Sequence, residues 1–226
     1  MPEYSLNHNL IRFFEQTKET FGPYFYENCE LGDNSYSNTK SKFSNQLCEF
    51  GESISSCQEC QLGNIRNKFV FGIGDPHADL MFIGEAPGKD EDLKGEPFVG
   101  KAGKLLDKIL SAINMNRYEN VYICNVLKCR PPQNRDPLSE EVEKCEPYLI
   151  HQIKLIRPQL IVALGRISAT TLLRIDGNLK SLRGKLHDYH GIPLRVTYHP
   201  AALLRNPNFK KPTWEDFQFI RDFIKN

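Results

Sequence analysis

Apolar segments of strand length alternate with segments of helical pattern through the middle of this chain, and no other feature constrains the fold as strongly. An apolar strand followed by a helical segment favours parallel strand pairing, with helices on both faces of the sheet. We therefore predict an α/β fold. The three strand and helix pairs cover residues 78–84 and 101–113, 120–127 and 139–156, and 159–165 and 166–175.

The two ends of the chain differ in pattern from this central part. Residues 6–21 have the spacing of an amphipathic helix, residues 28–44 are rich in Ser, Asn and Gly, and a short helix is expected from Asn45. We interpret residues 1–50 as an extension and linker of unassigned role, and residues 51–226 as the folded domain. Near the C-terminus, residues 185–200 predict a hairpin turning at His190 and Gly191, and a helix opening with Pro212 closes the chain.

Composition excludes some classes of protein and leaves others open. The 226 residues are 40% hydrophobic and 25% charged, with a formal net charge of +1. No apolar run reaches the roughly 18 residues that a bilayer crossing needs, and the first ten residues do not resemble a signal peptide. We expect a cytoplasmic protein without membrane contact. A net charge near zero neither indicates nor excludes a nucleic-acid partner.

Four of the seven cysteines have the spacing of a metal or cluster site. Cys57 and Cys60 form a CxxC pair, and fifteen residues separate Cys129 from Cys145. Two thiolates on one tight turn and two from a distant segment suit a four-thiolate site, and the spacing fits either an iron–sulfur cluster or a structural zinc. Buried structural cysteines are the simpler alternative. The other three, Cys29, Cys48 and Cys124, lack a partner at ligand spacing.

Residues 84–92, with the sequence GEAPGKDED, follow the first predicted strand. Loops at the carboxyl ends of parallel strands are where α/β proteins build their sites. Asp90, Glu91 and Asp92 have an ordinary alternative role, because carboxylates near the start of a helix are favoured by its dipole. Glu85 is not explained in this way, and we take it as the candidate functional carboxylate.

A second strand-end segment, TYHPAALLRNPNFKKP at residues 197–212, places His199 directly before a proline. A histidine at a strand end is as often a structural residue with its hydrogen bonds satisfied. Its position after a strand, like that of Glu85, makes it a second candidate functional residue.

Four segments taken in order, GEAPGKDED, PFVG, CNVLKCRPPQNRDP and YHPAALLRNP, resemble those of the family 4 uracil-DNA glycosylases, the thermostable iron–sulfur type. The resemblance runs from about Cys57 to the C-terminus. It implies a three-layer α/β/α sandwich with a central four-stranded parallel sheet and a uracil pocket in the loops after the strands. It also implies a [4Fe-4S] cluster, with zinc as the alternative, on Cys57, Cys60, Cys129 and Cys145.

The same resemblance implies an enzyme that releases uracil from DNA by hydrolysing its N-glycosidic bond, and assigns roles to individual residues. Glu85 and His199 become the catalytic pair, with Glu91 as a second candidate carboxylate. Phe98 would stack on uracil and Asn125 would read its edge. Ala86, which stands where many relatives have a second glycine, would narrow the pocket.

The expected partner is uracil-containing DNA, single-stranded or double-stranded, bound by a monomer. A glycosylase cannot reach its bond inside stacked DNA, so the nucleotide must be turned out. We expect Leu203, Leu204 and Arg205 to enter the groove as a wedge. A glycosylase for another deaminated or damaged base, or a metal-bound nucleic-acid-binding module without turnover, remain alternatives. Phosphate contacts are expected from Lys101, Lys104, Arg130, Arg135, Lys180, Arg183, Lys185, Lys210 and Lys211.

Overall fold

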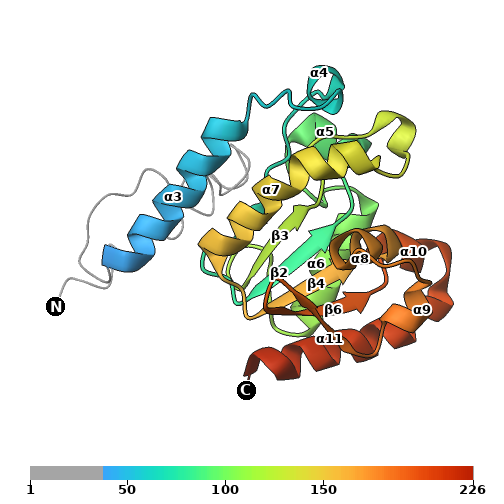
Figure 1. The fold of residues 1–226 in the computed structure, drawn as a ribbon. Coiled ribbons are helices and arrows are strands. Elements are labelled where there is room, and N and C mark those ends of the chain that lie inside the picture. The colour runs from blue at the N-terminus through green and yellow to red at the C-terminus, as the bar shows by residue number, and fades with distance from the viewer. Residues whose placement is uncertain (1–37, 226) are drawn as a thin grey trace, which may run out of the picture.

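A computed structural model describes residues 38–225 of the chain, with side chains from residue 45 onward. The helix predicted for residues 6–21 lies outside the described residues. The helix expected from Asn45 begins earlier, because α3 spans Asn38–Ile54 and includes residues predicted as linker. It packs along α7 (Ser139–Ile156), where the Phe50 ring lies 4.3 Å from that of His151 (Figure 1).

The centre of the molecule is a mostly parallel sheet, as predicted. Its core consists of four parallel strands in the order β3-β2-β4-β6, and an antiparallel strand is added at each edge, so that six strands run β1-β3-β2-β4-β6-β5. The predicted four strands are therefore the parallel part of a wider sheet. The strands are β1 (Ile73–Gly74), β2 (Leu80–Gly84), β3 (Val121–Asn125), β4 (Leu160–Leu164), β5 (Leu186–Tyr189) and β6 (Ile192–Thr197).

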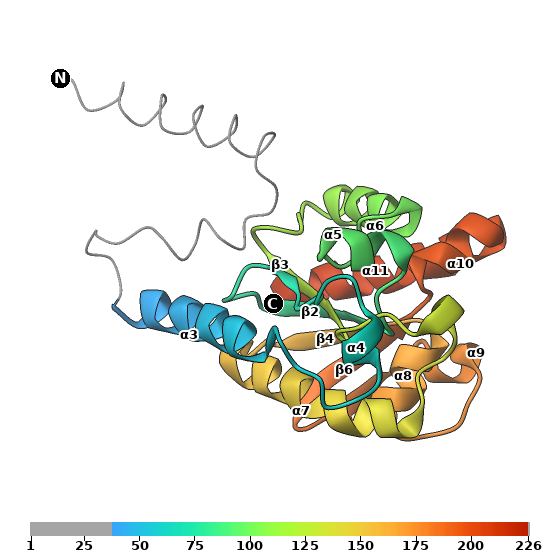
Figure 2. The same ribbon diagram turned by 90° about the horizontal axis from the view of Figure 1, so that it is seen from above.

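Helices cover both faces of this sheet, giving the expected three layers (Figure 2). Alternate residues of β2 point to opposite faces: Phe82 packs with residues of α6 (Lys101–Ala112) and α11 (Lys210–Lys225), and Ile83 packs with residues of α7 and α8 (Arg166–Leu173). All five residues of β2 are buried, which explains its uninterrupted apolar sequence.

The connecting segments also follow local chemistry. The predicted hairpin turn is present, with φ of 51° at His190 and 82° at Gly191, the positive values that a two-residue I′ turn requires. Helix α11 begins two residues before Pro212, which lies in its first turn, where a missing N–H costs no helical hydrogen bond. Short helices are α4 (Leu62–Ile65), α5 (Lys89–Lys94), α9 (Leu179–Leu182) and α10 (Pro200–Arg205), with 3₁₀ turns at Pro132–Asn134 and Pro207–Phe209.

Within residues 38–225, none of the helices combines the length and the apolar composition needed to cross a bilayer.

Candidate active site at the carboxyl edge of the sheet

The four parallel strands end side by side, and the residues that end or follow them line one pocket of about 630 Å³. The strand register brings this about: Gly84 pairs with Asn125, and Leu164 pairs with Thr197. Glu85 and His199, predicted on separate segments, therefore open into the same hollow. Ala86, Glu91, Phe98 and Asn125 line it as well.

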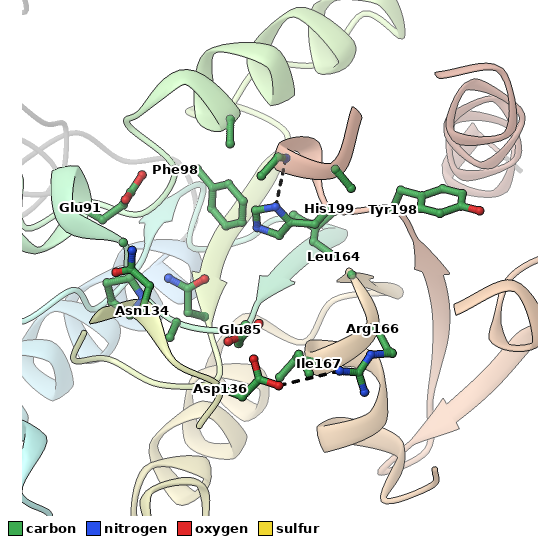
Figure 3. A pocket seen from close by; sticks show the side chains of 18 of the residues that line it. Glu85, Glu91, Phe98, Asn134, Asp136, Leu164, Arg166, Ile167, Tyr198 and His199 are labelled. Atoms are coloured by element: carbon green, nitrogen blue, oxygen red, sulfur yellow. Dashed lines mark hydrogen bonds and ion pairs between the residues drawn. The ribbon is translucent and has the colours of Figure 1, made fainter. Parts of the chain in front are cut away.

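Glu85 carries a carboxyl group that holds its proton more tightly than an ordinary glutamate. Burial raises the pKa of Glu85 to about 7, the negative charge of Asp136 adds to the rise, and the positive charge of Arg166 opposes it. Figure 3 shows the Glu85 and Asp136 carboxylates facing one another, with Arg166 paired to Asp136 at 3.8 Å. Glu85 thus changes its charge close to neutral pH.

His199 is a buried, neutral imidazole. Burial lowers the pKa of His199 to about 4, and the positive charge of Arg205 lowers it further. Its Nδ1 accepts a hydrogen bond from the Ala201 N–H at 3.1 Å, at the start of α10. The single ring proton of this neutral histidine therefore sits on Nε2, which makes Nε2–H a hydrogen-bond donor.

Phe98 forms an aromatic wall of the pocket beside His199. The two ring centroids are 5.4 Å apart with 30° between their planes, and Figure 3 shows the rings next to each other. Phe98 is 5% exposed and has a φ of 56°, a left-handed conformation that few non-glycine residues adopt. Its place in the pocket was expected from the family resemblance, but its backbone conformation was not.

Asn125, the last residue of β3, is buried beside Phe98. A Cβ atom at Gly84 would lie 2.3 Å from Asn125 Oδ1 and 2.7 Å from Phe98 Cζ. Both side chains therefore pass over Gly84, and this close approach requires glycine there. The Asn125 carbonyl accepts a hydrogen bond from the buried Lys128 ammonium at 2.8 Å, which fixes the end of the strand.

Glu91 lines the pocket, but its carboxylate is engaged with the backbone. Oε1 accepts hydrogen bonds from the N–H groups of Val99 at 2.9 Å and Gly100 at 3.1 Å. Asp90, Glu91 and Asp92 occupy the first turn of α5, as the capping alternative predicted. Of the two carboxylates considered from sequence, Glu85 has the less committed side chain.

The four cysteines predicted as ligands line a second, smaller hollow, which is bordered by the start of the β3 to α7 connection and by α7 itself. Hydrogen-bond donors approach three of the sulfur atoms. The Arg66 guanidinium lies 3.4 Å from Cys129 Sγ, the Lys128 backbone N–H lies 3.3 Å from Cys145 Sγ, and the Tyr148 hydroxyl lies 3.3 Å from Cys57 Sγ.

Burial raises the pKa of the Cys129 thiol and raises that of Cys145 to about 12, partly offset by Arg66 and Lys128 respectively. Thiolates at these positions therefore need a cationic partner. Cys48 is disulfide-bonded, and Cys124 is a buried residue of β3. Among residues 38–225, no three His, Cys, Asp or Glu side chains are arranged to hold a single metal ion.

Comparison with known proteins places this pocket in a family. The model of the uracil DNA glycosylase superfamily matches residues 71–218, which include every pocket residue discussed above. The chain belongs to the uracil-DNA glycosylase superfamily.

Its relatives within this superfamily include several named as type-4 uracil-DNA glycosylases. The chain is 47% identical over 175 residues to the one from Archaeoglobus fulgidus, which covers 74% of this chain and 87% of the relative. It is 43% identical over 183 residues to that of Saccharolobus solfataricus (77% and 85%) and 40% identical over 183 residues to that of Thermotoga maritima (77% and 92%).

Two neighbouring residues that were predicted to form the wedge differ in their exposure to solvent. Leu203 is 3% exposed and packs inside, whereas Leu204 is 51% exposed on α10. Arg205 lines the pocket. The wedge proposal therefore rests on Leu204 and Arg205. Among the predicted phosphate contacts, Arg135 is paired with Glu141 and Arg183 with buried Asp216, so these two guanidinium groups also hold the fold together.

Sequence reasoning missed several residues of the glycosylase-superfamily pocket. Gly165 and Arg166 follow β4 just as Glu85 follows β2, so the strand-end argument applied to residues 159–165 would have found them. Tyr198 directly follows β6, so the same argument would have found it as well. Asp136 gave no such signal, because its place depends on how its loop folds back over the sheet.

Proposed function

We propose that this protein is a uracil-DNA glycosylase that removes uracil from DNA by hydrolysis and leaves an abasic site. One observation carries the proposal: Glu85, Phe98, Asn125 and His199 meet in one pocket, in a chain 40–47% identical to five type-4 uracil-DNA glycosylases. Acidic, aromatic, amide and imidazole side chains suit activation of water, stacking on the base, reading of its edge and stabilisation of the leaving group, respectively.

In the proposed reaction, the oxygen of water bonds to the sugar carbon C1′ while the bond from C1′ to N1 of uracil breaks. The electron pair of that bond leaves with the base. Above its pKa, the Glu85 carboxylate accepts the proton of the water and opposes the positive charge that builds on the sugar. That proton then passes to the uracil anion, and neutral uracil is released.

The leaving base is stabilised by a hydrogen-bond donor that is in place before the bond breaks. Negative charge develops on O2 of uracil as the bond breaks, and the His199 Nε2–H is suited to stabilise it. A neutral histidine has its donor in place over the whole neutral pH range, because the pKa of His199 is lowered to about 4.

Selection of uracil is assigned to Asn125 and Phe98. An amide both donates and accepts hydrogen bonds, so it can match N3–H and O4 of uracil, whereas the exocyclic amine of cytosine reverses this pattern. The Phe98 ring offers a stacking face for any pyrimidine, so it adds affinity without selecting the base. Ala86 borders the same space and limits the size of the base.

Leu204 and Arg205 are proposed to hold the DNA open while uracil occupies the pocket. Leu204 is exposed on α10, the same short helix whose first turn fixes His199. A wedge and a catalytic donor on one helix would couple extrusion of the nucleotide to formation of the active site.

The second hollow is proposed to hold a [4Fe-4S] cluster on Cys57, Cys60, Cys129 and Cys145. Support comes from the four thiols around one space and from the donors aimed at three of their sulfurs, which lower the energy of thiolate ligands. When bound, the cluster would supply cross-linking of the segment before α4, the β3 to α7 connection and α7 itself. No catalytic step is assigned to it.

The deciding experiment uses the purified full-length protein and oligonucleotides with a single uracil, hypoxanthine, thymine or cytosine. We expect release of free uracil from single-stranded and duplex DNA in the presence of a chelator, with little release of the other bases. Release of hypoxanthine in preference to uracil would change the proposed substrate. DNA binding without release of any base would make the protein a binding module.

A further inference from the structure

The backbone at Pro97 and Phe98 is held by the guanidinium group of Arg117, which does not line the 630 Å³ pocket. Arg117 donates from Nη2 to the Phe98 carbonyl at 2.8 Å and from Nη1 to the Pro97 carbonyl at 3.2 Å. Its Nε donates to Asp107 Oδ1 of α6 at 2.7 Å. Arg117 is 7% exposed, so these bonds form with little competition from water.

Arg117 binds the backbone at a residue that is under conformational strain. Phe98 has a φ of 56°, which a residue with a bulky side chain adopts only when its surroundings enforce it. The Phe98 carbonyl also packs so closely against α6 that a Cβ at Gly103 would lie 1.6 Å from its oxygen. Arg117 therefore directs the Phe98 carbonyl into the space that is free because Gly103 has no side chain.

Two clamps act on this short segment from opposite sides. Glu91 accepts from the N–H groups of Val99 and Gly100, and Arg117 donates to the carbonyls of Pro97 and Phe98. Three consecutive peptide groups, from Pro97 to Gly100, are thus fixed by two charged side chains. An arginine is suited to binding two neighbouring carbonyls, because its planar guanidinium group donates several hydrogen bonds in fixed directions. A lysine ammonium is a single point charge without this geometry.

We infer that Arg117, oriented by Asp107, is a positioning residue for uracil recognition: it holds Phe98 in the strained backbone conformation that turns its ring toward the pocket. This inference rests on the proposed function, since the ring matters only if a base stacks on it. Arg117 touches no substrate and acts through Phe98 alone.

The test is a double-mutant cycle on the full-length protein, with uracil release from a single-stranded oligonucleotide as the readout. In the wild-type background, Arg117→Gln should lower kcat/KM roughly tenfold, as expected for loss of charged hydrogen bonds that shape the site. It should also weaken inhibition by free uracil by a similar factor. In a Phe98→Ala background, the same substitution should change both quantities less than about twofold.

Two further variants keep the test decisive. Asp107→Asn retains the shape of the side chain but removes its charge, and it should reproduce a weaker form of the Arg117→Gln effect even if Arg117→Gln folds poorly. Arg174→Gln serves as the matched control, because it removes an arginine paired with buried Glu146 outside the pocket, and it should leave inhibition by uracil unchanged.

Equal losses from Arg117→Gln in both backgrounds would overturn the inference, since Arg117 would then act on the fold in general. Failure of the proposed function has a different signature, because the wild-type protein itself would then release no uracil.

Discussion

The pocket at the carboxyl edge and the hollow lined by cysteines are both partly buried, yet burial has opposite consequences in them. In the pocket, burial keeps Glu85 near its point of ionisation and His199 uncharged, which makes both groups ready for proton and hydrogen-bond chemistry. In the hollow, burial disfavours the thiolates of Cys129 and Cys145, so these thiolates need a nearby positive charge to be stable. The same physical effect therefore produces reactivity in one region and ligand affinity in the other.

The two regions are joined by one short segment of chain. Asn125 ends β3 in the pocket, and Cys129 follows four residues later in the hollow. Buried Lys128 contacts both, through its ammonium to the Asn125 carbonyl and its backbone N–H to Cys145 Sγ. Substitutions on either side should show how far the regions are independent.

The largest expected effect is on activity alone. Glu85→Gln should lower the single-turnover rate of uracil release by roughly 10³-fold, because it removes the charge that activates water and stabilises the sugar cation. Visible absorption from the proposed cluster should be unchanged, since Glu85 is not part of the hollow.

The same variant should gain stability at alkaline pH. The pKa of Glu85 is raised to about 7 in the folded protein, so the wild type loses stability as pH rises from the unfolded value of 4.5 through 7. Glu85→Gln should therefore have a higher Tm than wild type at pH 8 and an equal Tm at pH 4. A retained rate in this variant would remove Glu85 from the proposed chemistry.

The next effect should be on stability and colour. Cys145→Ala should abolish the broad visible absorption of anaerobically purified protein and lower Tm by about 10 °C or more, because a ligand that ties α7 to the hollow is lost. Uracil release at low temperature should survive in part. A colourless wild-type protein that contains zinc would replace the iron–sulfur proposal.

A smaller effect separates two neighbouring residues of α10. Leu204→Ala should lower kcat/KM on duplex DNA about threefold to tenfold and leave single-stranded DNA nearly unaffected, because only the duplex has to be opened. Leu203→Ala should instead destabilise the protein by about 2–3 kcal/mol, as expected for a buried leucine, without changing the ratio of the two substrates. Equal behaviour of the two variants would contradict the wedge proposal.

The smallest effect is a shift in pH dependence. Asp136→Asn removes a negative charge beside Glu85, which lowers the pKa of Glu85 and moves the acidic limb of the activity profile down by about half a pH unit. Arg166→Gln should move the same limb upward. Because the Asp136 and Arg166 side chains are largely exposed, both shifts should shrink at high salt. Shifts in the same direction would mean that another group controls the limb.

The features of the fold and site that could be predicted from the sequence are those set by residues within one segment of the chain. The three strand and helix pairs follow from periodicity within each segment, and the strand-end position of Glu85 and His199 follows from the rule for parallel sheets. Edge strand β1 was not predicted, because two residues carry no periodic signal.

Features that depend on tertiary contact gave no signal in the sequence. Arg117 lies in a connection between α6 and β3, and its function comes only from the carbonyls that it meets there. Leu203 and Leu204 are equally apolar, and the turn of about 100° per residue along a helix decides which of them faces solvent.

The missing side chain at position 84 has a consequence for engineering. Any methyl group there would collide with both the amide and the aromatic ring that are proposed to contact the base, so a library designed to broaden the range of excised bases should keep this glycine invariant. Position 86 is the better target for substitution, because Ala86 borders the same volume. Replacing Ala86 with glycine is the minimal change by which this scaffold could be retuned to admit a bulkier lesion.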